Sequence, residues 1–301
     1  MMGAVAATPA PIRFRPMPLP ELLDELFRLY RRHFSLIVGV ALLVALPGLV
    51  WTLVTGTYRL TSSSFANIFT TAPGAQPAFN SQQFSNLAGA YTLAGIGTFF
   101  LLPLTLGAVT RAVTDVALGR AATIGSVLRE TLARYWRLLG LVGLLYLIAI
   151  GWTIAFIIGL ALLIVPSLAV ICAGIYLAVR WSLSVAAMMA EDIGPIKGMS
   201  RSWNLVAGQW WRTFGIILVV LIMRFIIGLA LGFLFGLIAG FVTSGDVGLA
   251  VVAVGTAVLG ALISPIITIA FVLLYFDLRV RKEGLDLDQL AQQTSTGPAP
   301  A

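Results

Sequence analysis

Long apolar stretches separated by short polar segments run through most of the chain. A helix needs about 20 mostly apolar residues to cross a bilayer, and six stretches meet that requirement. They cover residues 35–55, 88–108, 138–165, 167–190, 213–241 and 247–276. The pattern predicts an all-α polytopic membrane protein with six transmembrane helices.

The boundary between the third and fourth stretches is the least distinct, because only Pro166 separates them. Two arrangements fit: a tight helical hairpin, or one long kinked span followed by an interfacial piece. We favour the hairpin, since the combined apolar run is too long for a single crossing.

The composition agrees with a membrane protein. Hydrophobic residues make up 59% of the 301 positions and charged residues only 10%, with a net charge of +7. A soluble domain is typically about 25% charged. These values exclude an ordinary soluble enzyme, a disordered chain and a nucleic-acid-binding domain, so membrane lipids rather than nucleic acid are the expected partners.

Basic residues alternate from one side of the predicted spans to the other. They gather before the first span, between the second and third, between the fourth and fifth, and after the sixth, while the opposite loops hold only Arg59. Basic loops stay in the cytoplasm. The alternation therefore predicts an even number of spans in the plasma membrane, with both termini cytoplasmic.

The chain then divides into three parts. Residues 1–34 form a cytoplasmic segment with an amphipathic helix, residues 35–283 the six-span domain, and residues 284–301 a cytoplasmic tail. Two polar stretches, 56–87 and 292–301, have the composition of unstructured segments.

Three amphipathic segments on the cytoplasmic side each lead into an odd-numbered span. They start near Pro20, Thr123 and Pro195, which are residue types that favour the start of a helix. We expect three interfacial helices, and a threefold architecture in which each unit is an interfacial helix followed by two spans. The alternative is that the similarity only reflects the basic linkers common in multi-span proteins. Aromatic and basic residues suited to the headgroup layer are interpreted as interface anchors: Trp136, Arg137, Trp210, Trp211, Arg212, Tyr275, Arg279 and Arg281.

The fifth span carries four glycines at a spacing of four: Gly228, Gly232, Gly236 and Gly240. Such a strip lets helix backbones approach closely. Packing within the chain is the favoured interpretation, and a homodimer seam is the alternative.

Arg180 and Arg224 fall inside predicted spans, where an arginine at the bilayer centre costs about 2.5–3.5 kcal/mol. Together with Trp181 they are our candidate site for an anion such as a lipid phosphate, because guanidinium groups bind phosphate through paired hydrogen bonds. Snorkelling, or bonding to carbonyls at helix ends, is the simpler explanation, and we favour it.

The sequence offers no catalytic, cofactor or metal site. Its single cysteine, Cys172, lies within a span, where an apolar setting leaves a thiol inert. Its single histidine, His33, lies at the entry to the first span. The short motifs of hydrolases and nucleotide-binding proteins are missing, so we expect a protein that is not an enzyme.

Several strings carry a family resemblance: residues 22–34, 176–182, 191–195, 200–206, 210–212 and, most specifically, 274–284. Together they resemble the membrane domain of bacterial glycerophosphoryl diester phosphodiesterases, which also occurs as a stand-alone protein. In full-length members of that family, the hydrolase activity belongs to an attached soluble domain with His pairs and metal-binding carboxylates. The resemblance therefore implies a multi-pass bacterial plasma-membrane protein without the reaction, and it brings no catalytic residues.

Two functions remain open after this reading. The leading one is a non-enzymatic scaffold or lipid-interacting module, with a soluble cytoplasmic partner as one form of it. The other is a small transporter or channel for an anionic or amphiphilic ligand. A polar cavity between the fourth, fifth and sixth spans favours transport, whereas a solid apolar bundle favours scaffolding.

Overall fold

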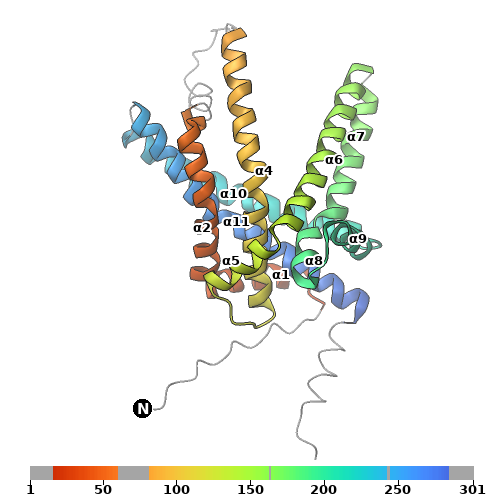
Figure 1. Ribbon diagram of the computed structural model, residues 1–301. Helices are drawn as coiled ribbons and strands as arrows, with labels where there is room; N and C mark the ends of the chain where they lie inside the picture. Colours follow the sequence, from red (N-terminus) through yellow and green to blue (C-terminus); the bar gives the residue numbers. More distant parts are fainter. Residues whose placement is uncertain (1–15, 60–80, 163, 243–244, 285–301) are drawn as a thin grey trace, which may run out of the picture.

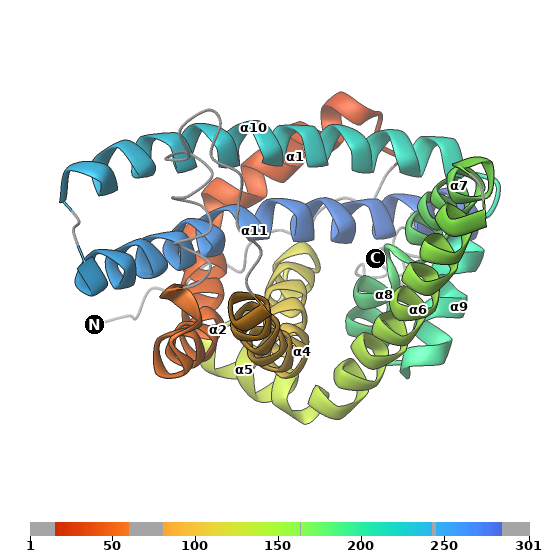
Figure 2. The same cartoon turned by 90° about the horizontal axis from the view of Figure 1, so that it is seen from above.

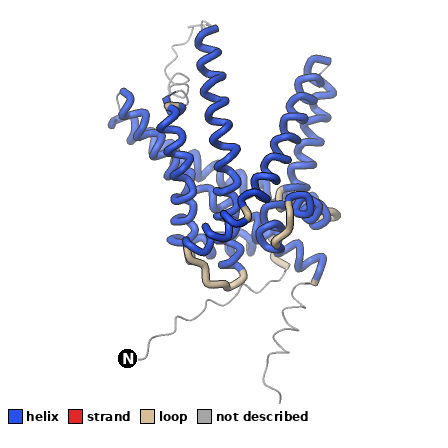
Figure 3. Tube along the Cα trace, in the orientation of Figure 1, coloured by secondary structure: helices blue, strands red, loops and turns tan. Residues whose placement is uncertain are grey.

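The computed structural model describes residues 16–59, 81–162, 164–242 and 245–284, and within these ranges the chain is helical without β-strands (Figure 3). The helices are α1 (Leu19–Arg32), α2 (Phe34–Thr55), α4 (Ser81–Ala117), α5 (Ile124–Ala133), α6 (Tyr135–Leu162), α7 (Ile164–Trp181), α8 (Ser184–Glu191), α9 (Pro195–Val206), α10 (Trp210–Val242) and α11 (Gly245–Glu283).

Six segments are long and apolar enough to cross a membrane, which confirms the predicted all-α polytopic class. They are Phe34–Thr55, Ala88–Ala117, Tyr135–Ala161, Pro166–Glu191, Trp210–Ile238 and Gly245–Glu283. The order of a short helix followed by two long ones occurs three times, starting at α1, α5 and α9. The short helix α8 is additional to that order and was not expected from the sequence.

The long helices diverge from one end of the molecule, as Figure 1 shows. α2 packs against α4 on one side, and α6 packs against α7 on the other. α10 and α11 run side by side across the molecule (Figure 2). The short helices α1, α5, α8 and α9 gather at the end from which the long helices diverge, in the lower half of Figure 1. We call this end, with the adjoining ends of the long helices, the basic face.

The buried core lies close to the basic face and is centred on α11, the most deeply buried of the six long segments. Tyr275 and Phe276 of α11 are its largest fully buried side chains. Towards the far ends, α6, α7 and α10 instead expose large apolar residues such as Leu147, Ile171 and Phe225. Lipid tails suit these surfaces, because a soluble protein rarely exposes contiguous apolar surface of this extent.

The predicted segment 1–34 is not separate from the spans. Within its described part, Leu22 and Leu26 of α1 have no exposed surface and belong to the same core as α2 and α11. α1 therefore docks on membrane-spanning helices through its apolar face. The predicted helix start at α5 is confirmed, because the Thr123 hydroxyl accepts a hydrogen bond from the backbone N–H of Ser126 (3.2 Å).

The third and fourth spans form two separate helices, as the hairpin interpretation predicts. A β-carbon placed on Gly159 of α6 would lie 3.2 Å from the backbone nitrogen of Ser167 in α7. The backbones thus approach closely where the two helices meet, and glycine leaves room for that approach.

Several predicted boundaries were wrong. α4 begins at Ser81, so the end of the supposedly unstructured stretch 56–87 is helical, while residues 60–80 lie outside the described residues. α4 also continues to Ala117, and Arg111 and Asp115 form an ion pair within its last turns. The fourth span has the predicted extent, but it is interrupted, because α7 ends at Trp181 and α8 covers Ser184–Glu191. The tail from residue 285 onwards also lies outside the described residues.

Candidate functional site

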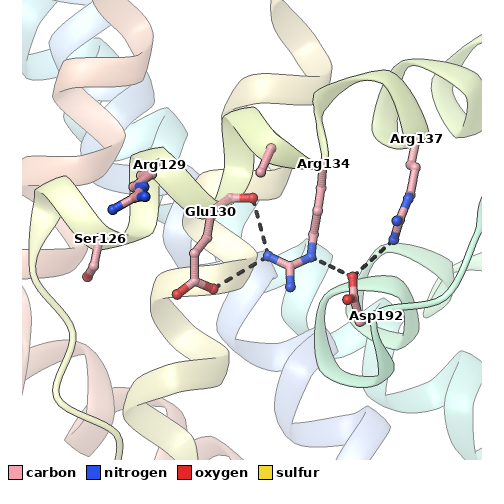
Figure 4. Close-up of a pocket in the computed structure, with 7 residues that line it drawn as sticks. Ser126, Arg129, Glu130, Arg134, Arg137 and Asp192 are labelled. Carbon is pink, nitrogen blue, oxygen red and sulfur yellow. Dashed lines mark hydrogen bonds and ion pairs between the residues drawn. The ribbon is translucent and has the colours of Figure 1, made fainter.

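A hollow with a volume of about 600 Å³ opens on the basic face, between α5, the start of α6 and the turn from α8 to α9. Three arginine side chains line the hollow, and two carboxylates lie among them (Figure 4). Its lining residues are Ser126, Arg129, Glu130, Ala133, Arg134, Arg137 and Asp192.

Local helix geometry brings the three arginines together. α5 ends at Ala133 and α6 begins at Tyr135, so Arg134 is the single residue between two helices. Arg137 lies one turn further on, and its backbone N–H donates to the carbonyl of Arg134 (3.1 Å). Arg129 projects from the preceding part of α5. Arg134 and Arg137 are three positions apart, a spacing that puts two side chains next to each other on a helical turn.

Asp192 joins the two arginines at the α5–α6 junction. Its Oδ1 atom accepts hydrogen bonds from Arg134 Nε (2.7 Å) and from Arg137 Nη1 (3.1 Å) (Figure 4). The hydrogen bond from Arg134, with Arg137 and Arg111 nearby, holds the pKa of Asp192 below its ordinary value. The same hydrogen bond raises the pKa of Arg134. Both groups are therefore charged at neutral pH.

The backbone of Asp192 is held in an uncommon conformation. Its φ of 53° is the only positive φ at a non-glycine residue in the described part of the chain. Such a conformation costs about 1 kcal/mol or more, although Asp and Asn tolerate it better than most residues. The turn between α8 and α9 thus presents this carboxylate to the hollow at some energetic cost.

Glu130, the second carboxylate of the hollow, is paired with arginines. Glu130 Oε2 lies 2.5 Å from Arg111 Nη2 and 3.4 Å from Arg134 Nη1. Arg111 is itself buried and pairs with Asp115 (3.0 Å). Much of the negative charge of Glu130 is therefore compensated from within α4.

Arg129 differs from its two neighbours. It is exposed, and no hydrogen bond or ion pair within the described ranges involves it. Nearby, the indole of Trp136 is 77% exposed. An unpaired guanidinium and an exposed indole suit the boundary between headgroups and acyl chains.

A second ionic cluster continues from the hollow towards α11. Glu191, which directly precedes Asp192, accepts hydrogen bonds from Arg201 Nε (2.8 Å) and from the hydroxyl of Tyr275 (2.5 Å). Arg201 also pairs with Glu283 at the end of α11, and these carboxylates raise the pKa of Arg201. Two consecutive acids thus connect the hollow to the central helix.

The structure does not bring the predicted anion site together. Arg180 lies in the last turn of α7, where Nη1 donates to the carbonyl of Trp203 (3.0 Å) and Nε donates to the hydroxyl of Tyr176 (3.0 Å). Its guanidinium carbon also lies 4.5 Å from the centre of the Trp203 ring. This is the geometry of the simpler explanation, bonding to carbonyls at a helix end.

Arg180 lies one residue before the end of α7, within the span Pro166–Glu191. The Trp181 ring lies 6.2 Å from that of Trp203, so it belongs to the aromatic group around Arg180. Arg224 lies elsewhere, exposed on α10, and no interaction with Arg180 connects the two among the described residues.

The predicted interface anchors are divided between the surface and the interior. Trp136 and Trp211 are largely exposed, and Arg137 lines the hollow. Trp210 stacks on Phe214, with ring centres 5.2 Å apart. The remaining anchors take part in ion pairs or hydrogen bonds near the end of α11: Arg212, Tyr275, Arg279 and Arg281. Tyr275 is fully buried, because α8 and α9 cover the end of α11 that was expected to face the headgroups.

The glycine strip on α10 is mostly open. A β-carbon on Gly228 would lie 4.0 Å from Ile263, but at Gly232 and Gly236 it would meet no atom within 4 Å. Packing within the chain, the favoured interpretation, is therefore not found at these two positions. Gly240 lies outside the residues whose packing the structure describes.

Sequence reasoning missed the hollow itself. Arg129, Arg134 and Arg137 lie within nine positions, but a basic segment at that place was explained by membrane topology. Asp192 follows more than fifty positions later, so no local pattern connects it to these arginines. In the described ranges, no group of three or more His, Cys, Asp or Glu side chains is placed to hold a metal ion.

No protein-family model, curated protein or solved structure matches this chain. The six membrane-spanning segments and the geometry of the basic face are therefore the features that bear on function.

Proposed function

We propose that this integral membrane protein is a lipid-interacting protein without enzymatic activity. Its basic face lies at the cytoplasmic surface of the plasma membrane, and the hollow binds the phosphate of anionic lipid headgroups. The proposal is in keeping with the sequence resemblance to a stand-alone membrane domain.

The observation that carries the proposal is that Arg129, Arg134 and Arg137 line one hollow at the end of membrane-spanning helices. Guanidinium groups form paired, charge-assisted hydrogen bonds with phosphate oxygens. Anionic lipids are concentrated in the cytoplasmic leaflet, where each nearby basic residue contributes about 1 kcal/mol of attraction. A hollow next to an exposed tryptophan is within reach of those headgroups.

Transport is the second candidate function, and it has less support. A translocation route between α7, α10 and α11 would need polar groups free to meet a ligand. Arg180 is instead bonded to Tyr176 and Trp203. The arginine hollow lies on the other side of α8, next to α5. A scaffold for a soluble partner is compatible with lipid binding and would use the same basic face.

The decisive experiment compares lipid retention by purified variants. Native mass spectrometry would count the anionic lipids that stay bound to the protein in detergent. Arg129→Gln is the cleanest variant, because Arg129 has no partner in the described structure whose loss could disturb folding. Arg32→Gln is the matched control, since Arg32 is also exposed on the basic face but lies outside the hollow.

We expect Arg129→Gln to lose bound anionic phospholipid several-fold, and Arg32→Gln to retain it. Equal retention by both variants and the unmodified protein would contradict a headgroup site at the hollow. Turnover of glycerophosphodiesters by the purified protein with added divalent metal would contradict the absence of enzymatic activity.

A further inference from the structure

The arginine hollow already holds an anion that belongs to the protein. A single oxygen of Asp192 receives the hydrogen bonds of both Arg134 and Arg137. We propose that Asp192 occupies the position of a ligand phosphate, and that the ligand which displaces it is a phosphate monoester. This inference rests on the proposed function. It adds the chemical class of the ligand and the residue that occupies the site when no ligand is bound.

Asp192 makes the contacts that a bound phosphate would make, so we call it a place-holder for the ligand. Arg134 Nε and Arg137 Nη1 converge on one atom at 2.7 and 3.1 Å, which are ordinary distances for a charge-assisted hydrogen bond to phosphate as well. The Asp192 side chain is 57% exposed and can swing away into solvent. The third arginine, Arg129, lines the same hollow without a partner, so the single carboxylate leaves part of the hollow's capacity unused.

Charge explains why a monoester is the better competitor. A phosphodiester carries one negative charge, as the carboxylate does, so exchanging the two gains little. A phosphate monoester carries about 1.5 to 2 negative charges at pH 7 and three terminal oxygens. It can therefore bind Arg134 and Arg137 through separate oxygens, and Arg129, which lines the same hollow, adds to the positive potential there. Glu130 opposes this only weakly, because Arg111 compensates its charge at 2.5 Å.

Displacement of Asp192 has a structural consequence. The hydrogen bonds from Arg134 and Arg137 connect the α8–α9 turn to the α5–α6 junction. Glu191, the preceding residue, holds the same turn on Arg201 and Tyr275. Ligand binding therefore replaces one of two ionic attachments of the turn, while the attachment to α11 stays in place. The backbone of Asp192 is then free to leave its left-handed conformation.

The test compares phosphatidic acid, a monoester, with phosphatidylglycerol, a diester. The protein is reconstituted in phosphatidylcholine nanodiscs, and each lipid is supplied from phosphatidylcholine vesicles that contain it. The amount of lipid transferred to the nanodiscs is then quantified. We expect a preference for phosphatidic acid of about tenfold, the effect of one additional charge-assisted hydrogen bond. Inorganic phosphate, titrated onto the protein in detergent, distinguishes a free phosphate from a lipid headgroup as the source.

Asp192→Asn is the diagnostic variant, because asparagine tolerates the left-handed backbone but carries no charge. We expect it to raise affinity for phosphatidic acid several-fold, and Asp24→Asn, a charge-matched control at an exposed position of α1, to change nothing. Hydrogen exchange at Asp192 and Gly194 should quicken when phosphatidic acid binds.

Each failure has a different meaning. Unchanged or weaker binding by Asp192→Asn would overturn the place-holder role, since it would show that the carboxylate orients the arginines or has no effect. Equal affinity for the two lipids, with no binding of inorganic phosphate, would overturn the monoester assignment. Insensitivity of all anionic binding to Arg129→Gln would instead refute the headgroup site on which the inference rests.

Discussion

The backbone N–H of Met17 donates a 2.8 Å hydrogen bond to Asp277, a residue 260 positions further along the chain. Asp277 is buried in α11, and its carboxylate also pairs with Arg212 (3.0 Å) and Arg281 (3.1 Å). Both arginines also donate hydrogen bonds to the backbone carbonyl of Met17. The backbone N–H and the carbonyl of Met17, which precedes α1, are therefore both bonded to this cluster. The start of the described chain is thus fastened to the end of its last helix.

Asp277→Asn should destabilise the protein by about 3 kcal/mol, because removing one partner leaves buried charges uncompensated. Asp246→Asn is the control: Asp246 pairs with Arg59 at an exposed site, where an ion pair contributes about 0–1 kcal/mol. Thermal unfolding in detergent measures both. Equal unfolding temperatures for the two variants would show that the buried cluster does not hold the segment before α1 against α11.

The break between α7 and α8 is bridged by a residue of α9. The Ser202 hydroxyl donates to the carbonyl of Arg180 (2.7 Å) and accepts from the backbone N–H of Leu183 (3.2 Å). Ser202→Ala should cost about 1–3 kcal/mol, since it leaves buried backbone groups without partners. Ser200→Ala, at an exposed position of the same helix, should be neutral. A stable Ser202→Ala variant would mean that the break needs no such bridge.

The two glycine environments on α6 and α10 predict opposite responses. Gly159→Leu should destabilise by about 1–3 kcal/mol, because the new side chain meets the backbone of α7 at Ser167. Gly232→Leu should change the free energy of unfolding by no more than about 0.5 kcal/mol, because a β-carbon at that position would meet no atom within 4 Å. Unfolding curves and size-exclusion profiles test both. Loss of an oligomer on Gly232→Leu would instead support the homodimer seam.

The link between Asp192 and the arginines should depend on pH in one direction. The folded-state pKa of Asp192 is lowered, so its stabilising contribution is complete above the ordinary carboxyl pKa of about 4. It is lost as the pH falls through the lower, folded value. The stability difference between the unmodified protein and Asp192→Asn should be constant from neutral to mildly acidic pH and shrink below about pH 4. A difference that grows on acidification would contradict this assignment.

The periodic apolar pattern was sufficient to predict the number and order of the spans. The ion pair between Asp277 and Arg281 follows a similar local rule, since residues four positions apart on a helix are neighbours. Both features depend on neighbours in sequence. The cap of α5 at Thr123 belongs to the same class.

Features that depend on distant residues were not predictable. Arg111 and Asp115 look like loop residues, yet Glu130 of α5 and the carbonyl of Met189 hold Arg111 inside the protein and let α4 continue. The break after Trp181 depends on Ser202 from another helix. The hollow needs a carboxylate from the α8–α9 turn. In each case the deciding partner comes from a separate segment, and a single sequence carries no signal for such contacts.

The proposed function requires the basic face to lie in the cytoplasm, and cysteine labelling tests this most directly. In a Cys172→Ser background, Asp246→Cys and Ser200→Cys put single thiols at exposed positions of opposite ends of the spans. A membrane-impermeant maleimide applied to intact cells with a permeable outer layer should label Asp246→Cys at once, and Ser200→Cys only after the plasma membrane is opened. Labelling of Ser200→Cys in intact cells would put the arginine hollow on the wrong side and contradict the account.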